Sequence, residues 1–154
     1  MYDFSVSHTF ERSVVIEAPV GRVWRALTEP REVVAWDTGL GDPLDAPPDY
    51  PQPGQHVRWR YRLGPLPLLL HDRPQEVSEG RLLRSLIAIG PVRIDETYTL
   101  SAAGMGTRLT ASLSVRTALP VIGPLVERLF VARQSEATVE QSLAAIKRHC
   151  ETRP

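Results

Sequence analysis

Alternating apolar and polar residues mark several extended segments along this chain of 154 residues. The clearest is HVRWRYRL, residues 56–63, in which four apolar side chains alternate with three arginines. Successive side chains of a strand point to opposite faces of its sheet, so this period of two predicts a strand with one buried face. Three other segments alternate in the same way: FERSVVIEA (10–18), VRIDETYTL (92–100) and TRLTASLSV (107–115).

Two more segments predict strands of a different character. LPLLLHDRPQEV (66–77) contains two prolines, which cannot donate a ladder hydrogen bond, so we expect a short or edge strand there. RLLRSLIAI (81–89) is apolar on both faces, which indicates a central strand. The glycine-containing turn SAAGMG (101–106) predicts a hairpin between the strands on either side of it.

Helical periodicity appears towards both ends of the chain. PVGRVWRALTEP (19–30) begins with a proline suited to a first helical turn and ends at another proline, and REVVAWD (31–37) predicts a second short helix. From residue 120 to residue 151 the pattern predicts a long amphipathic helix. Its apolar stripe contains one acid and consists of Leu125, Leu129, Ala132, Glu136, Val139, Leu143, Ile146 and Cys150.

Residues 38–55, TGLGDPLDAPPDYPQPGQ, contain five prolines, three glycines and no apolar period. We expect a weakly ordered loop without apolar anchoring near the entrance of a pocket, because long loops in compact domains are usually functional or mobile. Trp36, which precedes this loop, is a candidate gate of that pocket. The alternative is that Trp36 only anchors the loop.

The composition fits one globular domain, which we expect to span residues 1–154. Apolar residues make up 42% of the chain and charged residues 23%, and 18 basic residues balance 18 acidic ones. A chain without net charge is a poor partner for nucleic acid or for an anionic membrane. No apolar run reaches the roughly 18 residues that cross a bilayer, and the first residues do not resemble a signal peptide. We therefore expect a cytoplasmic protein without stable membrane insertion.

Cysteine and histidine usage argues against a metal centre. The lone Cys150 excludes an internal disulfide and a multi-cysteine zinc site, and the four histidines are not spaced as ligands. A nucleophile elbow, a phosphate-binding loop and a dinucleotide fingerprint are all missing. We expect no metal and no cofactor, and the sequence does not decide between a monomer and a homodimer.

The order of the elements predicts an α+β fold in which a curved antiparallel sheet wraps around the long C-terminal helix. Within this order, FERSVVIEAPVGRVWRALTEP (10–30), GTRLT (106–110) and SLAAIKRHCE (142–151) resemble the START-like superfamily, also called Bet v 1-like or the polyketide cyclase/dehydratase and lipid-transport group. The resemblance covers nearly the whole chain. It implies a helix-grip fold with an apolar cavity between sheet and helix that serves lipids, sterols or polyketides, and it implies no fixed catalytic residue.

An acid on a buried strand face is the main functional signal of the sequence. In VRIDETYTL, Glu96 shares a face with apolar Ile94 and Leu100, although an ionised carboxylate without a partner is costly to bury. If the C-terminal helix covers this face, Glu96 points into the cavity, Glu136 faces it from the helix stripe, and Arg133 lies on the flank of that stripe. A desolvated carboxylate has a raised pKa and can act as a general acid or base, so Glu96 and Glu136 are our candidate catalytic residues.

The same cavity is expected to hold ligand-binding residues. Trp59, Tyr61 and Tyr98 combine a flat apolar ring with one polar atom, which suits them to pack on a planar ligand and to hydrogen-bond it. Arg133 and Trp36 complete this candidate set. A structural alternative stays open, in which Arg133 and Glu96 form a core salt bridge, or a bulge turns Glu96 outward, and the aromatic residues only fill the core.

These observations favour a protein that binds a hydrophobic small molecule. The leading interpretation is an enzyme similar to polyketide cyclases or dehydratases, in which Glu96, Glu136 or a tyrosine moves protons. The alternatives are a non-catalytic carrier or sensor of a lipid-like ligand and, third, a protein-interaction module. An enzyme needs several titratable groups that converge in the cavity, whereas a carrier needs a mostly apolar wall with one anchor.

Overall fold

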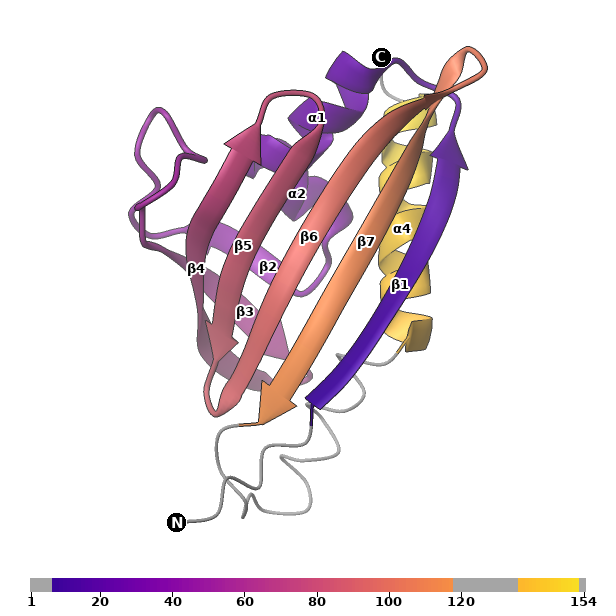
Figure 1. Cartoon of the computed structure of the whole chain (residues 1–154). Coiled ribbons are helices and arrows are strands. Elements are labelled where there is room, and N and C mark those ends of the chain that lie inside the picture. Colours follow the sequence, from indigo (N-terminus) through magenta and orange to yellow (C-terminus); the bar gives the residue numbers. More distant parts are fainter. Residues whose placement is uncertain (1–6, 118–135, 153–154) are drawn as a thin grey trace.

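The predicted α+β architecture is confirmed by a computed structural model of the chain, which describes residues 7–117 and 136–152. The strands form one curved antiparallel sheet of seven strands in the order β1-β7-β6-β5-β4-β3-β2. Figure 1 views this sheet from the face opposite the helices, with α4 behind β7 and β1. The helices therefore lie on one face of the sheet, as the helix-grip arrangement requires.

The elements differ in length but follow the expected order. None of the helices in the described residues is long and apolar enough to cross a membrane. In chain order the elements are β1 Ser7–Ile16, α1 Val20–Thr28, α2 Pro30–Trp36, β2 Leu40–Pro43, β3 Val57–Leu63, β4 Leu66–Ser78, β5 Leu82–Ile89, β6 Val92–Ala103, β7 Gly106–Thr117 and α4 Glu136–Thr152.

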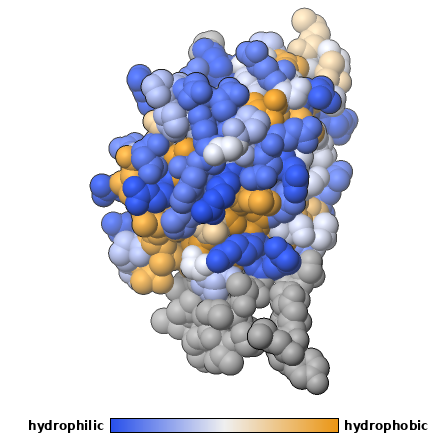
Figure 2. Space-filling view, turned by 60° about the vertical axis from the view of Figure 1, so that its left-hand side comes forward, coloured by the Kyte–Doolittle hydropathy of each residue, from blue (hydrophilic) through white to orange (hydrophobic). Residues whose placement is uncertain are grey.

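Side-chain alternation decides which face of each strand is buried. In β3 every apolar residue is buried and all three arginines are exposed, as the sequence predicts. The surface of the side that carries β3 and β4 is accordingly mostly hydrophilic, with some hydrophobic residues showing between the polar ones (Figure 2). Leu66 and Leu69 of β4 are among the exposed hydrophobic residues.

The C-terminal helix buries its apolar stripe as expected. It contacts β1, β7, α1 and α2, so sheet and helices share one core. Residues 125, 129 and 132 of the predicted stripe lie outside the described residues. The buried stripe residues within α4 are Val139, Leu143, Ile146 and Cys150.

The β4 strand is longer and more central than the sequence predicts. It runs for 13 residues and pairs with both β3 and β5. Pro67 lies near the turn to β3, and Pro74 lies where the register with β5 shifts, which are positions where a missing ladder donor costs little. The expected short or edge strand is therefore wrong. The sheet edge beside β3 is instead formed by β2, which the sequence did not predict.

The proline-rich loop is anchored, which corrects the expectation of a segment without apolar anchoring. Its first residues form β2 along β3. Asp45 accepts hydrogen bonds from the backbone N–H and from Nε of Arg58, each at 2.8 Å. Tyr50 packs against the hydrophobic core and donates a hydrogen bond to Asp72 of β4. Backbone pairing of β2 and a few single side chains, rather than a periodic apolar pattern, hold this segment in place.

A network of buried ionic side chains joins α1, α2 and α4. Arg22 donates to Oε1 of Glu32 at 2.6 Å, and Nε2 of His149 lies 2.9 Å from the same oxygen. Burial would raise the pKa of Glu32, but the hydrogen bonds from His149 and Arg22 outweigh it and lower the pKa. Because the Arg22 and His149 side chains are only 7% and 9% exposed, removing one partner leaves the others buried and poorly compensated.

Candidate functional site

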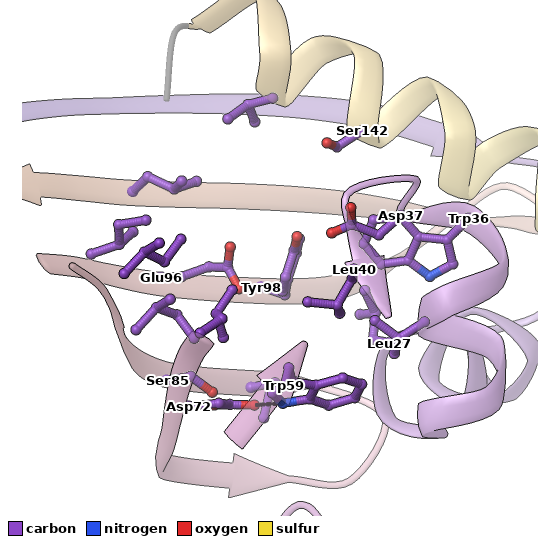
Figure 3. Close-up of a pocket in the computed structure, with 18 of the residues that line it drawn as sticks. Leu27, Trp36, Asp37, Leu40, Trp59, Asp72, Ser85, Glu96, Tyr98 and Ser142 are labelled. Carbon is purple, nitrogen blue, oxygen red and sulfur yellow. Dashed lines mark hydrogen bonds between the residues drawn. The ribbon is translucent and has the colours of Figure 1, made fainter. Parts of the chain in front are cut away.

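A cavity of about 120 Å³ lies between the sheet and the helices (Figure 3). Most of its wall is apolar, contributed by Leu27, Val33, Leu40, Leu70, Leu83, Ile87, Ile89, Ile94, Leu113, Val139 and Leu143. The polar and aromatic residues of the wall are Trp36, Asp37, Tyr50, Trp59, Asp72, Ser85, Glu96, Tyr98, Thr138 and Ser142.

Asp72 is the most deeply buried acid of this wall, and only 4% of it is exposed. It lies on the inward face of β4 beside Leu70. Its Oδ2 accepts a hydrogen bond from the Tyr50 hydroxyl at 2.5 Å and another from Trp59 Nε1 at 3.2 Å. Its Oδ1 is buried without a hydrogen-bond partner among the described residues. Burial raises the pKa of Asp72, although hydrogen bonding from Tyr50, Trp59 and Ser85 opposes the shift.

Tyr50 reaches into the cavity from the proline-rich loop. Its ring stands nearly edge-on to Trp59, with ring centroids 5.8 Å apart and an interplanar angle of 69°. Burial, followed by the charge of Asp72 and the hydrogen bond to it, raises the pKa of Tyr50 well above the ordinary value, and the charge of Glu96 adds to this effect. The phenol therefore stays protonated and serves Asp72 as a donor.

Glu96 lines the cavity, on the face that the sequence predicts. It lies opposite Ser85 of β5 and Leu113 of β7, and β6 pairs with both neighbours without a register shift, so no bulge turns Glu96 outward. Asp72, Ser85 and Glu96 form a polar strip across the inward faces of β4, β5 and β6, and Tyr98 projects into the cavity beside it (Figure 3).

The predicted aromatic residues divide between the cavity wall and the core. Trp59 and Tyr98 line the cavity, as expected. Trp36 also lines it, but its Nε1 donates to the carbonyl oxygen of Ala26 at 2.7 Å, which holds the indole in the wall. Tyr61 is buried in the core and is not part of the cavity wall.

Glu136 does not face the cavity, which corrects the expectation that it converges with Glu96. Its carboxylate pairs with Arg12 of β1, and Glu140 accepts from the same guanidinium at 3.1 Å. Arg12 lies on the inward face of β1, and α4 packs against this strand. Glu136 and Glu140 of α4 therefore pair with Arg12 rather than pointing into the cavity. Arg133, the third member of the expected cluster, lies outside the described residues.

Sequence reasoning missed Asp72 and Tyr50. Asp72 shares a face with Leu70 in LPLLLHDRPQEV, which is the same signal that identifies Glu96. The two prolines of this segment instead indicate a short or edge strand, in which no buried acid is expected. Tyr50 carries no such signal, because its contact with Asp72 joins a loop to a distant strand.

The site combines an apolar wall with a small group of titratable side chains. Such a cavity can hold an apolar molecule and orient it through one or two hydrogen bonds. A carboxyl group with a raised pKa can also give or take a proton near neutral pH. Within residues 7–117 and 136–152, no three His, Cys, Asp or Glu side chains are grouped as metal ligands.

The fold has counterparts among solved structures. The Zhui aromatase/cyclase from Streptomyces sp. R1128 matches with a TM-score of 0.72 and 15% identity, covering 96% of both chains. A START superfamily protein from Mycobacterium smegmatis has a TM-score of 0.72 and 16% identity, covering 94% of this chain and 98% of that chain. DynU16, from the dynemicin biosynthetic locus, has a TM-score of 0.65 and 22% identity, covering 94% of this chain and 47% of that chain. At these identities the likeness shows the fold alone.

A match to a family model carries the assignment further. No curated protein sequence matches the chain. The model of the polyketide cyclase / dehydrase and lipid transport family matches residues 7–151, from the first strand to the last turns of α4. The chain therefore belongs to the polyketide cyclase/dehydrase and lipid transport family.

Proposed function

We propose that this protein binds a hydrophobic small molecule in the cavity and moves protons on it, as an enzyme of the polyketide cyclase or dehydratase kind. The observation that carries the proposal is the strip of Asp72, Ser85 and Glu96 on the sheet side of a mostly apolar wall. A carrier needs one polar anchor, whereas this strip alone offers two carboxylates with hydroxyl groups beside them. An acid with a perturbed pKa inside a cavity, as Asp72 is, is typical of sites that do acid–base chemistry.

The carboxyl groups of Asp72 and Glu96 have different surroundings, which suits one to act as an acid and the other as a base. Asp72 is buried and its pKa is raised, so it is our candidate acid. Asp72 and Ser85 lie side by side in the cavity wall, so the carboxyl group of Asp72 is placed where a bound ligand could take its proton. Glu96 is only half-buried and is our candidate base. Trp59 and Tyr98 are the candidate ligand-binding residues beside them.

A dehydration illustrates the chemistry that this pair can perform. Glu96 removes a proton from the carbon next to a ligand carbonyl, and the electrons of that C–H bond form a C=C bond. The C–O bond of a hydroxyl group on the next carbon breaks, and the hydroxyl takes the proton of Asp72 and leaves as water. Proton exchange with water then restores Glu96 as the carboxylate and Asp72 as the acid. The sequence needs neither an oxidant nor a reductant.

Carbon-bound hydrogen exchange tests the proposal without the natural ligand. In D₂O the wild-type protein should accelerate the exchange of the methyl protons of acetophenone, followed by ¹H NMR. Glu96→Gln keeps the shape of the side chain and removes the base, so the acceleration should fall by about 100-fold, the usual contribution of general base catalysis. The melting temperature of this variant should stay equal to or exceed that of the wild type.

Glu136→Gln is the matched control, because Glu136 pairs with Arg12 outside the cavity. This variant should retain the exchange activity. If acetophenone binds in the cavity but its exchange is not accelerated, the protein is a carrier and the acid–base role is wrong. If Glu96→Gln lowers the melting temperature and the activity together, Glu96 is a structural residue.

A further inference from the structure

A second concave site lies on the outer face of the sheet, opposite the helices. It is a shallow groove of about 440 Å³ above β4, β5, β6 and β7. Its floor includes the exposed side chain of Leu86 and the small side chain of Ala88. The polar residues around the floor are Arg73, Arg93, Asp95, Ser114 and Arg116.

Positive charge is concentrated in this groove although the chain as a whole has no net charge. Arg93 of β6 and Arg116 of β7 lie directly opposite each other in the strand register. Like charges in this position repel and destabilise a sheet. Arg73 of β4 adds a third guanidinium from the far side of Leu86.

The arginines of the groove are not neutralised by ion pairs. Across the part of the chain that the structure describes, the Arg73 and Arg116 side chains form no hydrogen bond or ion pair. Among the residues that the structure describes, Arg93 donates only to the backbone carbonyls of Gly90 and Val92. The acid of the groove, Asp95, accepts two hydrogen bonds from Arg84, at 3.0 and 2.8 Å. These bonds and the charge of Arg84 lower the pKa of Asp95, and the charge of Arg116 adds to this effect, so Asp95 offsets part of the positive charge of the groove.

A neighbouring histidine reports the same positive field. His71 lies next to Arg73 on β4 and opposite Ala88 of β5. Burial lowers the pKa of His71, and the charges of His56, Arg73 and the other nearby arginines lower it further.

We propose that this groove binds the phosphate group of an organic phosphate monoester. Guanidinium groups match the geometry and charge of phosphate oxygens, and a dianion would relieve the repulsion between Arg93 and Arg116. Ser114 accepts a hydrogen bond from Thr9, so its own hydroxyl proton is available to the anion. Leu86, 39% exposed, offers an apolar surface for the organic part of the ligand. This site is separate from the cavity and independent of the function proposed for it.

Titration with phenyl phosphate tests the proposal, followed by ¹H–¹⁵N NMR of the whole chain. Phenyl phosphate should shift amide signals of β5, β6 and β7 around the groove. Inorganic phosphate should bind at least threefold more weakly because it has no group to contact Leu86, and phenol should not shift these signals. Arg116→Gln and Arg93→Gln should each weaken phenyl phosphate binding at least tenfold. Arg116→Gln should fold as well as the wild type because a repulsion has been removed, whereas Arg93→Gln also loses the hydrogen bonds to Gly90 and Val92, so Arg116→Gln is the decisive variant.

Arg108→Gln is the matched control, since Arg108 is exposed on the same face of β7 but outside the groove. This variant should bind phenyl phosphate like the wild type. Equal weakening in Arg108→Gln and Arg116→Gln would show attraction to the general charge of the surface and would overturn the site. No binding at millimolar phenyl phosphate would also overturn it, and inorganic phosphate binding as tightly as the ester would contradict the assignment to a monoester.

Discussion

At the scale of one residue, Asp72 is a buried acid whose hydrogen bonds replace only part of the water that surrounds an exposed carboxyl group. Two donors hold Oδ2, whereas Oδ1 has no partner among the described residues. The remaining cost of desolvation falls on the ionised form and appears as a raised pKa. A core that needed only packing would be served better by an apolar residue at this position, so the acid is explained by the groups it holds, Tyr50 and Trp59, and by the proton transfer proposed for it.

Asp72→Asn should make the stability of the protein less dependent on pH. The folded protein binds the Asp72 proton more tightly than the unfolded chain, whose carboxyl has a pKa near the ordinary 3.8. The stabilisation from this proton is complete below that pH and is lost as the pH rises through the raised pKa. The free energy of unfolding of the wild type relative to the variant, measured by urea denaturation, should therefore fall as the pH rises above 3.8 and through the raised pKa.

Asp42→Asn serves as the control for this experiment, because Asp42 is an exposed acid on β2. Its stability should follow that of the wild type across the same pH range. A wild-type advantage over Asp72→Asn that grows with pH would mean that the ionised carboxylate is the favoured form in the fold.

At the scale of elements, alternation predicts a strand well when one of its faces meets the core, as β3 demonstrates. It fails for β4 because prolines were taken to exclude a central strand, whereas the fold places them near a turn and at a register shift. It fails for β2 because four residues are too few to show a period. The pairing of β2 with β3 is a tertiary contact that no local pattern encodes.

The candidate site was predictable to a similar extent. Glu96 follows from the strand pattern alone, and Asp72 would have followed from the same rule. The stripe of the C-terminal helix gives the buried side of the helix but not which strand faces each position. Arg12, a cation on the mostly apolar face of β1, was the available sign that an acid such as Glu136 would pair there.

Tyr50→Ala should release the proline-rich loop from the cavity. The ring of Tyr50 packs on Trp59 and its hydroxyl holds Asp72, so removing both contacts should lower the free energy of unfolding by up to about 3 kcal/mol. Limited proteolysis should then cut between residues 44 and 56 faster than in the wild type. The cavity, about 120 Å³ in the wild type, should also gain room toward the roughly 300 Å³ and above that is usual for ligand sites.

Tyr50→Phe separates the two contacts, because it keeps the ring and removes only the hydroxyl. Its loop should be cut at a rate close to that of the wild type, whereas fluorescence of anilinonaphthalene sulfonate in the enlarged cavity should increase only in Tyr50→Ala. Identical cleavage of the wild type and Tyr50→Ala would mean that β2 and Asp45 hold the loop without Tyr50.

At the scale of the whole molecule, the sheet joins distant parts of the sequence into one unit. β1 pairs with β7 along its entire length, and α4 then packs across this pair. The turn at the end of the β6–β7 hairpin approaches β1 so closely that a Cβ added at Gly106 would overlap the backbone carbonyl of Ile16. We propose from this pairing that residues 1–154 form a single domain that unfolds in one step.

Two glycine substitutions, one expected to destabilise the protein and one expected to stabilise it, test whether the chain unfolds as a single domain. Gly106→Ala should force β1 and β7 apart and lower the free energy of unfolding by about 1–3 kcal/mol, as overpacking usually does. Gly21→Ala adds a methyl group to α1 where no atom lies within 4 Å, and it should raise the free energy of unfolding by about 0.5–1 kcal/mol through helix propensity.

In one cooperative domain each substitution moves every transition equally. Far-UV circular dichroism follows the secondary structure, and tryptophan fluorescence follows the core through Trp24, Trp36 and Trp59. Within each protein, wild type or variant, the two signals should therefore give the same midpoint. Separate midpoints, or a Gly106→Ala shift seen by only one of the two signals, would show that the strands near the chain ends unfold apart from the cavity and that the single domain is wrong.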